Sequence, residues 1–163
     1  MKIFRLVIFL ILVYLLQVIV ISRFAVLGVA ANLPLIVTAL FAVTFGAEKG
    51  FIVGLICGLI QDILGGGFYI NTISFGLLGF LIGTFKESVL GTEEAVSLAA
   101  VIAATVTAFV FELLLLFFFF GKPLGSPISI LITLAISCLY NSVITPVLYP
   151  AIKLSSRYLI EAE

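Results

Sequence analysis

Few side chains in this sequence could do chemistry. The candidates are two acids, Asp62 and Glu112, and two cysteines, Cys57 and Cys138, and all four lie in or beside apolar stretches. Catalysis needs cooperating acids, bases or nucleophiles, and a metal site needs several ligands close together. The chain has no histidine, and neither acid has a second acid or a nucleophile at a cooperating spacing. The sequence therefore predicts no enzyme, no cofactor, no metal and no disulfide framework, and both cysteines are interpreted as small packing residues.

The composition indicates whether this protein is surrounded by water or by lipid. The chain is 64% hydrophobic and 10% charged, with a mean hydropathy of +1.43, which leaves too little polar surface to cover a water-soluble protein. Stretches such as residues 6–16 and 113–120 are apolar on every side, so they predict helices rather than the alternating strands of a barrel. The net charge of zero gives no indication of a nucleic-acid partner. We therefore expect an all-α integral membrane protein in a lipid bilayer.

Charges and turn residues divide the chain into six apolar segments. Pro34 suits the first turn of the second segment, where its missing N–H would be unpaired in any case. Gly65, Gly66 and the glycine that follows predict a turn, whereas Pro146 and Pro150 are expected to kink or end the last segment. The expected spans of this single transmembrane domain are residues 3–21, 33–47, 50–64, 70–85, 96–120 and 128–152.

The second, third and fourth segments are short for a membrane. At about 13 to 16 residues each they would cover roughly 20 to 24 Å of a hydrocarbon core near 30 Å. Either flanking charges such as Glu48 and Lys49 reach the membrane surface, or these helices are tilted or broken and shielded by the longer ones. A re-entrant hairpin over residues 33–64 is an alternative.

Basic residues predict the orientation, because Lys and Arg are enriched in cytoplasmic loops. Six alternating spans would place six basic residues on one side and two on the other, so both termini are expected in the cytoplasm. The first segment is interpreted as an uncleaved anchor rather than a secretory signal, since it is long for a signal and more spans follow. The majority side has Lys2, Arg5, Lys49, Lys86, Lys153 and Arg157, and the minority side has Arg23 and Lys122.

Small residues recur at helical spacing on three of the spans. Gly54, Gly58 and Asp62 are spaced four apart, which predicts that a neighbouring helix approaches the bare backbone closely. On the fifth span a row of alanines leads to Glu112, and on the sixth Asn141 lies in a row of polar residues that should avoid lipid. The further members of these rows are Gly76, Gly79 and Gly83, Ala100, Ala104 and Ala108, and Thr133, Ser137 and Thr145.

Each acid has a functional and a structural interpretation. Glu112 lies about 12 Å below the outer end of its span, so it is either a proton or substrate site or, the favoured interpretation, a neutral acid hydrogen-bonded to hydroxyl groups or to the amide of Asn141. Asp62 precedes the glycine turn, and we expect its carboxylate to accept hydrogen bonds from the N–H groups of residues 65–67 rather than to act in catalysis. The phenylalanine run at residues 117–120 suggests a membrane interface, a patch that faces a partner, or simple lipid contact.

One stretch resembles a known family. A proline opens the second segment, the third segment has spaced glycines and ends in a Leu-x-x-Asp-x-x-x-Gly turn, and Asn71 and three more glycines follow. This pattern over residues 32–85 resembles the rod shape-determining protein MreD family. The residues that carry the resemblance, and that we take as structural, partner or pocket candidates, include Pro34, Gly54, Gly58, Asp62, Gly65, Gly66 and Asn71.

The resemblance implies a fold and a function. It implies a non-catalytic scaffold of the cell-elongation machinery in the bacterial inner membrane, bound to the single-span protein MreC and linked to MreB filaments and to the peptidoglycan polymerase and transpeptidase. It also implies six transmembrane helices similar to the substrate-binding subunit of energy-coupling-factor transporters. That likeness supplies an alternative function, the binding of a vitamin near Asp62, Tyr69 and Asn71. The alternative is disfavoured because the first span has no alanine patch for a transporter partner and the chain has no tryptophan.

Overall fold

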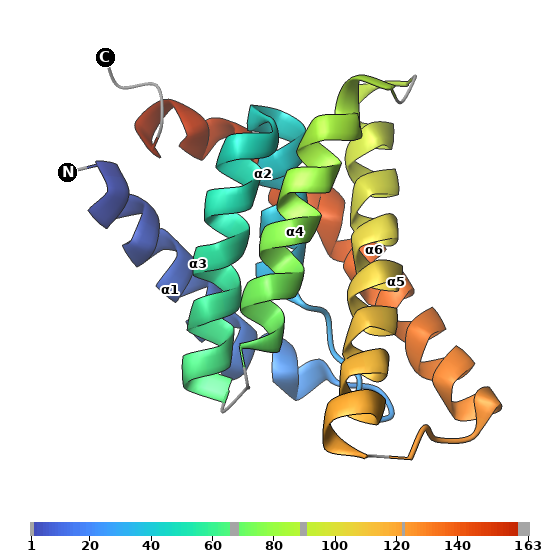
Figure 1. The fold of residues 1–163 in the computed structure, drawn as a ribbon. Coiled ribbons are helices and arrows are strands. Elements are labelled where there is room, and N and C mark those ends of the chain that lie inside the picture. The colour runs from blue at the N-terminus through green and yellow to red at the C-terminus, as the bar shows by residue number, and fades with distance from the viewer. Residues whose placement is uncertain (1, 66–68, 89–90, 122, 160–163) are drawn as a thin grey trace.

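The computed structural model describes residues 2–65, 69–88, 91–121 and 123–159, and in these ranges the chain forms a bundle of α-helices (Figure 1). The all-α fold that the composition predicted is confirmed, since the described residues contain no β-strand. The helices are α1 (Lys2–Ile19), α2 (Leu33–Phe45), α3 (Ala47–Gly65), α4 (Ile70–Phe85), α5 (Glu93–Phe120) and α6 (Pro127–Leu159), with short 3-10 helices η1 (Ile21–Phe24) and η2 (Lys86–Ser88).

Successive helices run in opposite directions. The start of α1, the end of α6 and the connections α2–α3 and α4–α5 therefore lie at one end of the bundle, which we call the terminal end (Figure 1). The connections α1–α2, α3–α4 and α5–α6 lie at the other end, the loop end. Lys49 and Lys86 are at the terminal end, whereas Arg23 is at the loop end.

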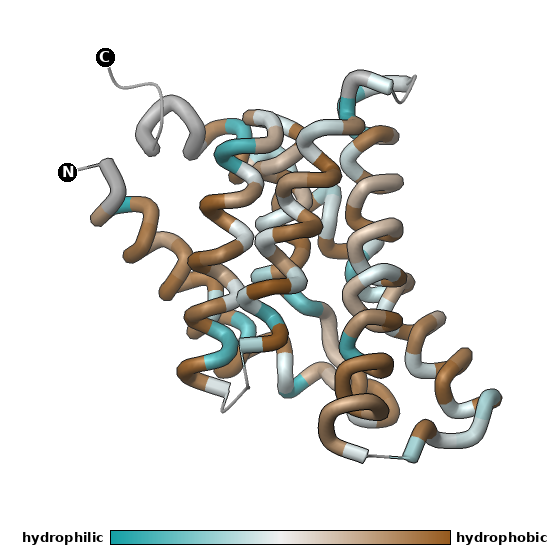
Figure 2. The backbone as a smooth tube through the Cα atoms, in the orientation of Figure 1, coloured by the Kyte–Doolittle hydropathy of each residue, from teal (hydrophilic) through white to brown (hydrophobic). Residues whose placement is uncertain are grey.

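Among the described residues, three segments are long and apolar enough to cross a membrane, judged by length and composition: Phe4–Phe24, Glu93–Phe120 and Pro127–Leu154. Hydrophobic residues cover most of their length in Figure 2. The helices α2 and α4 are apolar but shorter. The bundle therefore combines long helices with short ones, and the short helices need neighbours around them.

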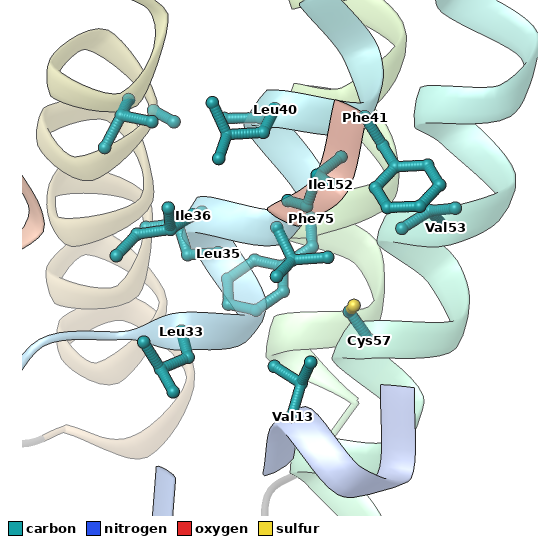
Figure 3. Packing of buried hydrophobic residues seen from close by; sticks show 14 of the residues in the cluster. Val13, Leu33, Leu35, Ile36, Leu40, Phe41, Val53, Cys57, Phe75 and Ile152 are labelled. Carbon is teal, nitrogen blue, oxygen red and sulfur yellow. The ribbon is translucent and has the colours of Figure 1, made fainter. Parts of the chain in front are cut away.

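The centre of the bundle is α2. Every residue from Leu33 to Ala42 is buried, and α2 contacts α1, α3, α4, α5 and α6. Its side chains form the middle of a hydrophobic cluster with residues of the surrounding helices, among them Phe75 and Ile152 (Figure 3). Of the expected ways to accommodate a short helix, α2 uses shielding by its neighbours.

The start of α2 follows from two residues. Asn32 is its N-cap, and its side-chain oxygen accepts a hydrogen bond from the backbone N–H of Leu35 at 3.1 Å. Pro34 lies in the first turn, where the sequence predicted it and where an N–H has no intrahelical partner. The cap and the proline together fix where the helix begins.

The helices α3 and α4 are in contact along bare backbone. A Cβ atom at Gly54 would overlap the carbonyl group of Phe75, and one at Gly58 would overlap that of Asn71. The glycine spacing predicted such a close approach, which lets backbone atoms of two helices pack together. Further glycines on this contact, where a Cβ would overlap the opposite helix or its flanking backbone, are Gly50, Gly79 and Gly83.

The largest differences from the predicted boundaries are at the starts of α3 and α5 and at the end of α6, and α3 begins at Ala47, three residues earlier than expected. Helix α6 does not end at its prolines but passes through Pro146 and Pro150 and continues to Leu159. Helix α5 begins three residues earlier than expected, at Glu93, because the hydroxyl of Thr92 caps it by accepting a hydrogen bond from the N–H of Ala95.

The glycine contact leads to a stability prediction. We expect Gly54→Ala to destabilise the protein by about 1–3 kcal/mol, because the added methyl group forces α3 and α4 apart. Gly65→Ala on the same helix is the matched control, since its Cβ would make only an ordinary contact, 3.5 Å from the hydroxyl oxygen of Tyr14. Unfolding in detergent, followed by circular dichroism, measures both. Equal stability of the two variants would contradict the role of the contact.

Candidate functional site

Asp62 of α3 holds the start of α4. The side chain is 2% exposed, and its Oδ1 accepts hydrogen bonds from the side-chain and backbone nitrogens of Asn71, at 2.9 and 3.3 Å. Its Oδ2 accepts from the backbone nitrogen and the hydroxyl of Thr72, at 2.8 and 2.7 Å. The first N–H groups of a helix have no intrahelical partner, and the helix dipole favours negative charge there. Asp62 thus caps α4 from a neighbouring helix.

These partners differ from the expected ones. The sequence predicted hydrogen bonds to the glycine turn, but the four bonds found at Asp62 come from α4. Gly66 and Gly67 lie outside the described residues. Gly58, one helical turn before Asp62, lets the backbone of Asn71 approach α3. That approach places the start of α4 opposite the carboxylate.

Asn141 of α6 makes a second connection between helices. It is 2% exposed, its Oδ1 accepts a hydrogen bond from the backbone N–H of Asn32 at 2.9 Å, and its Nδ2 donates to the hydroxyl oxygen of Thr105 at 2.8 Å. The hydroxyl of Thr105 in turn donates to the carbonyl oxygen of Val101 at 2.7 Å. One amide therefore connects α6, α5 and the start of α2.

A cavity of about 130 Å³ lies between these two connections, and we call it the polar cavity. The α1–α2 connection and helices α2, α4, α5 and α6 all contribute to its lining. Three candidate residues from the sequence, Asn71, Glu112 and Asn141, meet there, whereas Pro34, Gly54, Gly58 and Gly65 do not line it. The other polar lining residues are Asn32, Ser74, Thr105 and Ser137.

The expected hydrogen bond between Glu112 and the amide of Asn141 is absent. The amide of Asn141 is occupied by Asn32 and Thr105, and no hydrogen bond is found from Glu112 to another described residue. The side chain of Glu112 is exposed and lines the cavity. The prediction failed because the backbone N–H of Asn32, at the end of the α1–α2 connection, binds the amide oxygen of Asn141 instead.

The cavity is recessed at the loop end. Its floor includes Ile70 and Asn71, where α4 begins, and Leu35 near the start of α2. Helix α5 continues from Glu112 to Phe120, which adds eight residues and roughly 12 Å. The hairpin of α5 and α6 therefore extends beyond the ends of the short helices on one side of the cavity (Figure 1).

The remaining chemical candidates are dispersed. Cys57 is buried and Cys138 is half-buried, and both are free thiols on different helices. Within the part of the chain that the structure describes, no three His, Cys, Asp or Glu side chains group into a possible metal site. The arrangement around the polar cavity can donate and accept hydrogen bonds and offers one carboxyl group.

A family model described as rod shape-determining protein MreD matches residues 1–159. The chain belongs to the MreD family. It is therefore a rod shape-determining membrane protein. Comparison with curated proteins finds no significant match, and comparison with solved structures finds none either.

The MreD match reaches much further than the motif in residues 32–85. It includes α5 and α6, so the polar cavity with Glu112 and Asn141 lies wholly inside the matched region. The family relationship thus applies to the whole bundle rather than only to its glycine-rich middle.

Sequence reasoning missed two residues of the polar connections, Thr105 and Gln17. Gln17 accepts a hydrogen bond from the backbone N–H of Leu33 at 2.8 Å and so connects α1 to α2. Both left a signal. Gln17 is an isolated amide in an apolar span, and Thr105 precedes Glu112 by seven residues, which places the two on one helix face.

A second missed group lies at the terminal end. Glu93, in the first turn of α5, accepts hydrogen bonds from Lys153 and from the hydroxyl of Tyr149 on α6. Glu93 and Lys153 are both exposed. This group connects the two longest helices far from the polar cavity.

The cap on α4 gives a prediction. We expect Asp62→Ala to lower the unfolding free energy by about 1–3 kcal/mol, because it leaves the N–H groups of the half-buried Asn71 and Thr72 without their acceptor. Asp62→Asn keeps one acceptor oxygen and should cost less. Unfolding in detergent measures both changes.

The control for the cap is Glu94→Ala. Glu94 is an exposed acid in the first turn of α5, and its loss should change stability by no more than about 0.5 kcal/mol. If Asp62→Ala were as stable as Glu94→Ala, the cap would not hold α4 in place.

Proposed function

We propose that this chain is a non-catalytic membrane scaffold of the bacterial cell-elongation machinery, which binds MreC and helps to control peptidoglycan synthesis and cell shape. The observation that carries this proposal is the MreD family match over residues 1–159. A link to MreB filaments and to the peptidoglycan polymerase and transpeptidase is part of the proposed role.

The use of the polar residues supports a scaffold. Three polar side chains use their hydrogen bonds to join helices and so rigidify the bundle. They are Asp62, Asn141 and Gln17. The surface of α1, α5 and α6 carries many exposed large apolar side chains. A partner with one membrane helix would contact such a surface inside the bilayer.

The proposal includes six spans in the inner membrane with both termini in the cytoplasm. The alternating direction of the six helices supports it (Figure 1). So does the distribution of basic residues, because Arg5, Lys49, Lys86 and Lys153 belong to the terminal end and Arg23 to the loop end. A re-entrant hairpin over residues 33–64 and the likeness to energy-coupling-factor subunits stay predictions.

The vitamin-importer alternative has less support. Sites for drug-sized or cofactor-sized ligands usually enclose roughly 300–1,000 Å³. The polar cavity, at about 130 Å³, is well below that range. Asp62, which the alternative placed beside the vitamin, is buried and its two oxygens are already occupied.

Co-purification tests the scaffold function. A tagged copy of the chain, extracted from its own host in mild detergent, should retain an MreC-type single-span protein in equimolar amount. Depletion of the chain should turn rod-shaped cells round. Retention of a tightly bound vitamin without such a partner would contradict the scaffold and favour the importer.

Cysteine labelling tests the orientation. In a background with Cys57→Ala and Cys138→Ala, we expect a membrane-impermeant maleimide to label Arg23→Cys in cells stripped to their plasma membrane. Lys49→Cys should react only after permeabilisation. Both positions are exposed, so access to each depends on the side of the membrane. The reverse pattern would place the termini outside.

A further inference from the structure

Glu112 is a carboxyl group without a counter-charge. The residues that line the polar cavity come from five segments, and no Lys or Arg is among those described. A carboxylate at membrane depth normally pairs with a positive or hydrogen-bonding group. The amide of Asn141, which also lines the cavity, is already occupied. Glu112 is therefore free to bind something that the bundle does not supply.

The other polar groups at the cavity complete an acceptor site. Asn71 donates its side-chain N–H to Asp62, which leaves its amide oxygen as an acceptor. Ser137 donates its hydroxyl hydrogen to the carbonyl oxygen of Thr133 at 2.9 Å, so its oxygen can also accept. With the Glu112 carboxylate, the cavity offers acceptors from α4, α5 and α6. Such a set suits a compact cation that has several N–H donors.

The surroundings of the cavity suit a ligand with an apolar tail. The α5–α6 hairpin that borders the cavity carries large apolar side chains that are exposed, among them Leu114 at 46% and Leu131 at 65%. The cavity is recessed below the end of α5, so a headgroup that enters it leaves its chains beside this hairpin. Its volume of about 130 Å³ holds a small polar group but not a large ring system.

We propose that the polar cavity binds the primary ammonium headgroup of an aminophospholipid. The ammonium group donates hydrogen bonds to the carboxylate of Glu112 and to the oxygens of Asn71 and Ser137, and the acyl chains lie along the exposed apolar side chains of α5 and α6. A trimethylammonium headgroup has no N–H donor and does not fit this set. This site goes beyond the scaffold function, and neither proposal depends on the other.

The test compares lipids that differ only in the headgroup. The probes are short-chain phosphatidylethanolamine, phosphatidylcholine and phosphatidylglycerol with identical acyl chains, added to the purified full chain in detergent. Native mass spectrometry measures the bound lipid, and the unfolding temperature reports stabilisation. We expect phosphatidylethanolamine alone to bind with a defined stoichiometry and to raise the unfolding temperature.

Variants test whether the binding of phosphatidylethanolamine depends on Glu112. Glu112→Gln should weaken phosphatidylethanolamine binding about tenfold or more, because it removes a charge-assisted hydrogen bond. Ser137→Ala should weaken it by a smaller factor. The control is Glu94→Gln, an exposed acid at the terminal end, which should bind the lipid as the unchanged chain does.

Four results would overturn the proposal. The first is equal binding of phosphatidylcholine or phosphatidylglycerol, and the second is unchanged binding by both Glu112→Gln and Ser137→Ala. The third is equal binding of free ethanolamine, which would assign the site to a soluble amine. The fourth is a crosslink from position 112 to a basic side chain of a partner helix, which would make the cavity part of a protein interface.

Discussion

The backbone contact between α3 and α4 positions much of the rest of the molecule. Because Gly54 and Gly58 lack side chains, the two helices approach until their main chains meet, and Asp62 then lies opposite the first turn of α4. The capping bonds fix Asn71 at the cavity, and the joined helices form one wall around α2. In a bilayer, where a free N–H has no water to bind, this cap also removes the cost of starting α4 below the surface.

Unequal helix lengths create the polar cavity. The 16 residues of α4 span about 24 Å, whereas the 28 residues of α5 span about 42 Å. The difference leaves the loop ends of α2 and α4 recessed beside the α5–α6 hairpin. Polar side chains gather in the recess because the helix starts there need hydrogen-bond partners. Glu112 lies in the lining of this cavity.

The sequence predicted properties that depend on one segment at a time. Composition predicted an all-α membrane protein, Pro34 predicted the start of α2, and the glycine spacing predicted a close helix contact. Partners across the bundle were harder to predict, because they depend on the relative register of two helices. The amide of Asn141 was assigned to Glu112 although it binds Asn32, and Asp62 was assigned to a nearby turn although it caps α4. Of the two outcomes predicted for the α6 prolines, a kink or an end of the helix, the end did not occur.

The burial of α2 on all sides restricts how the protein can be assembled and how it can change. A helix of 13 residues has about 20 Å of length and no lipid-facing side of its own, so it gains a stable place only once its neighbours surround it. Its insertion is thereby coupled to theirs. Residues 33–42 therefore tolerate only side chains of similar volume, whereas the exposed faces of α1 and α6 carry no such restriction.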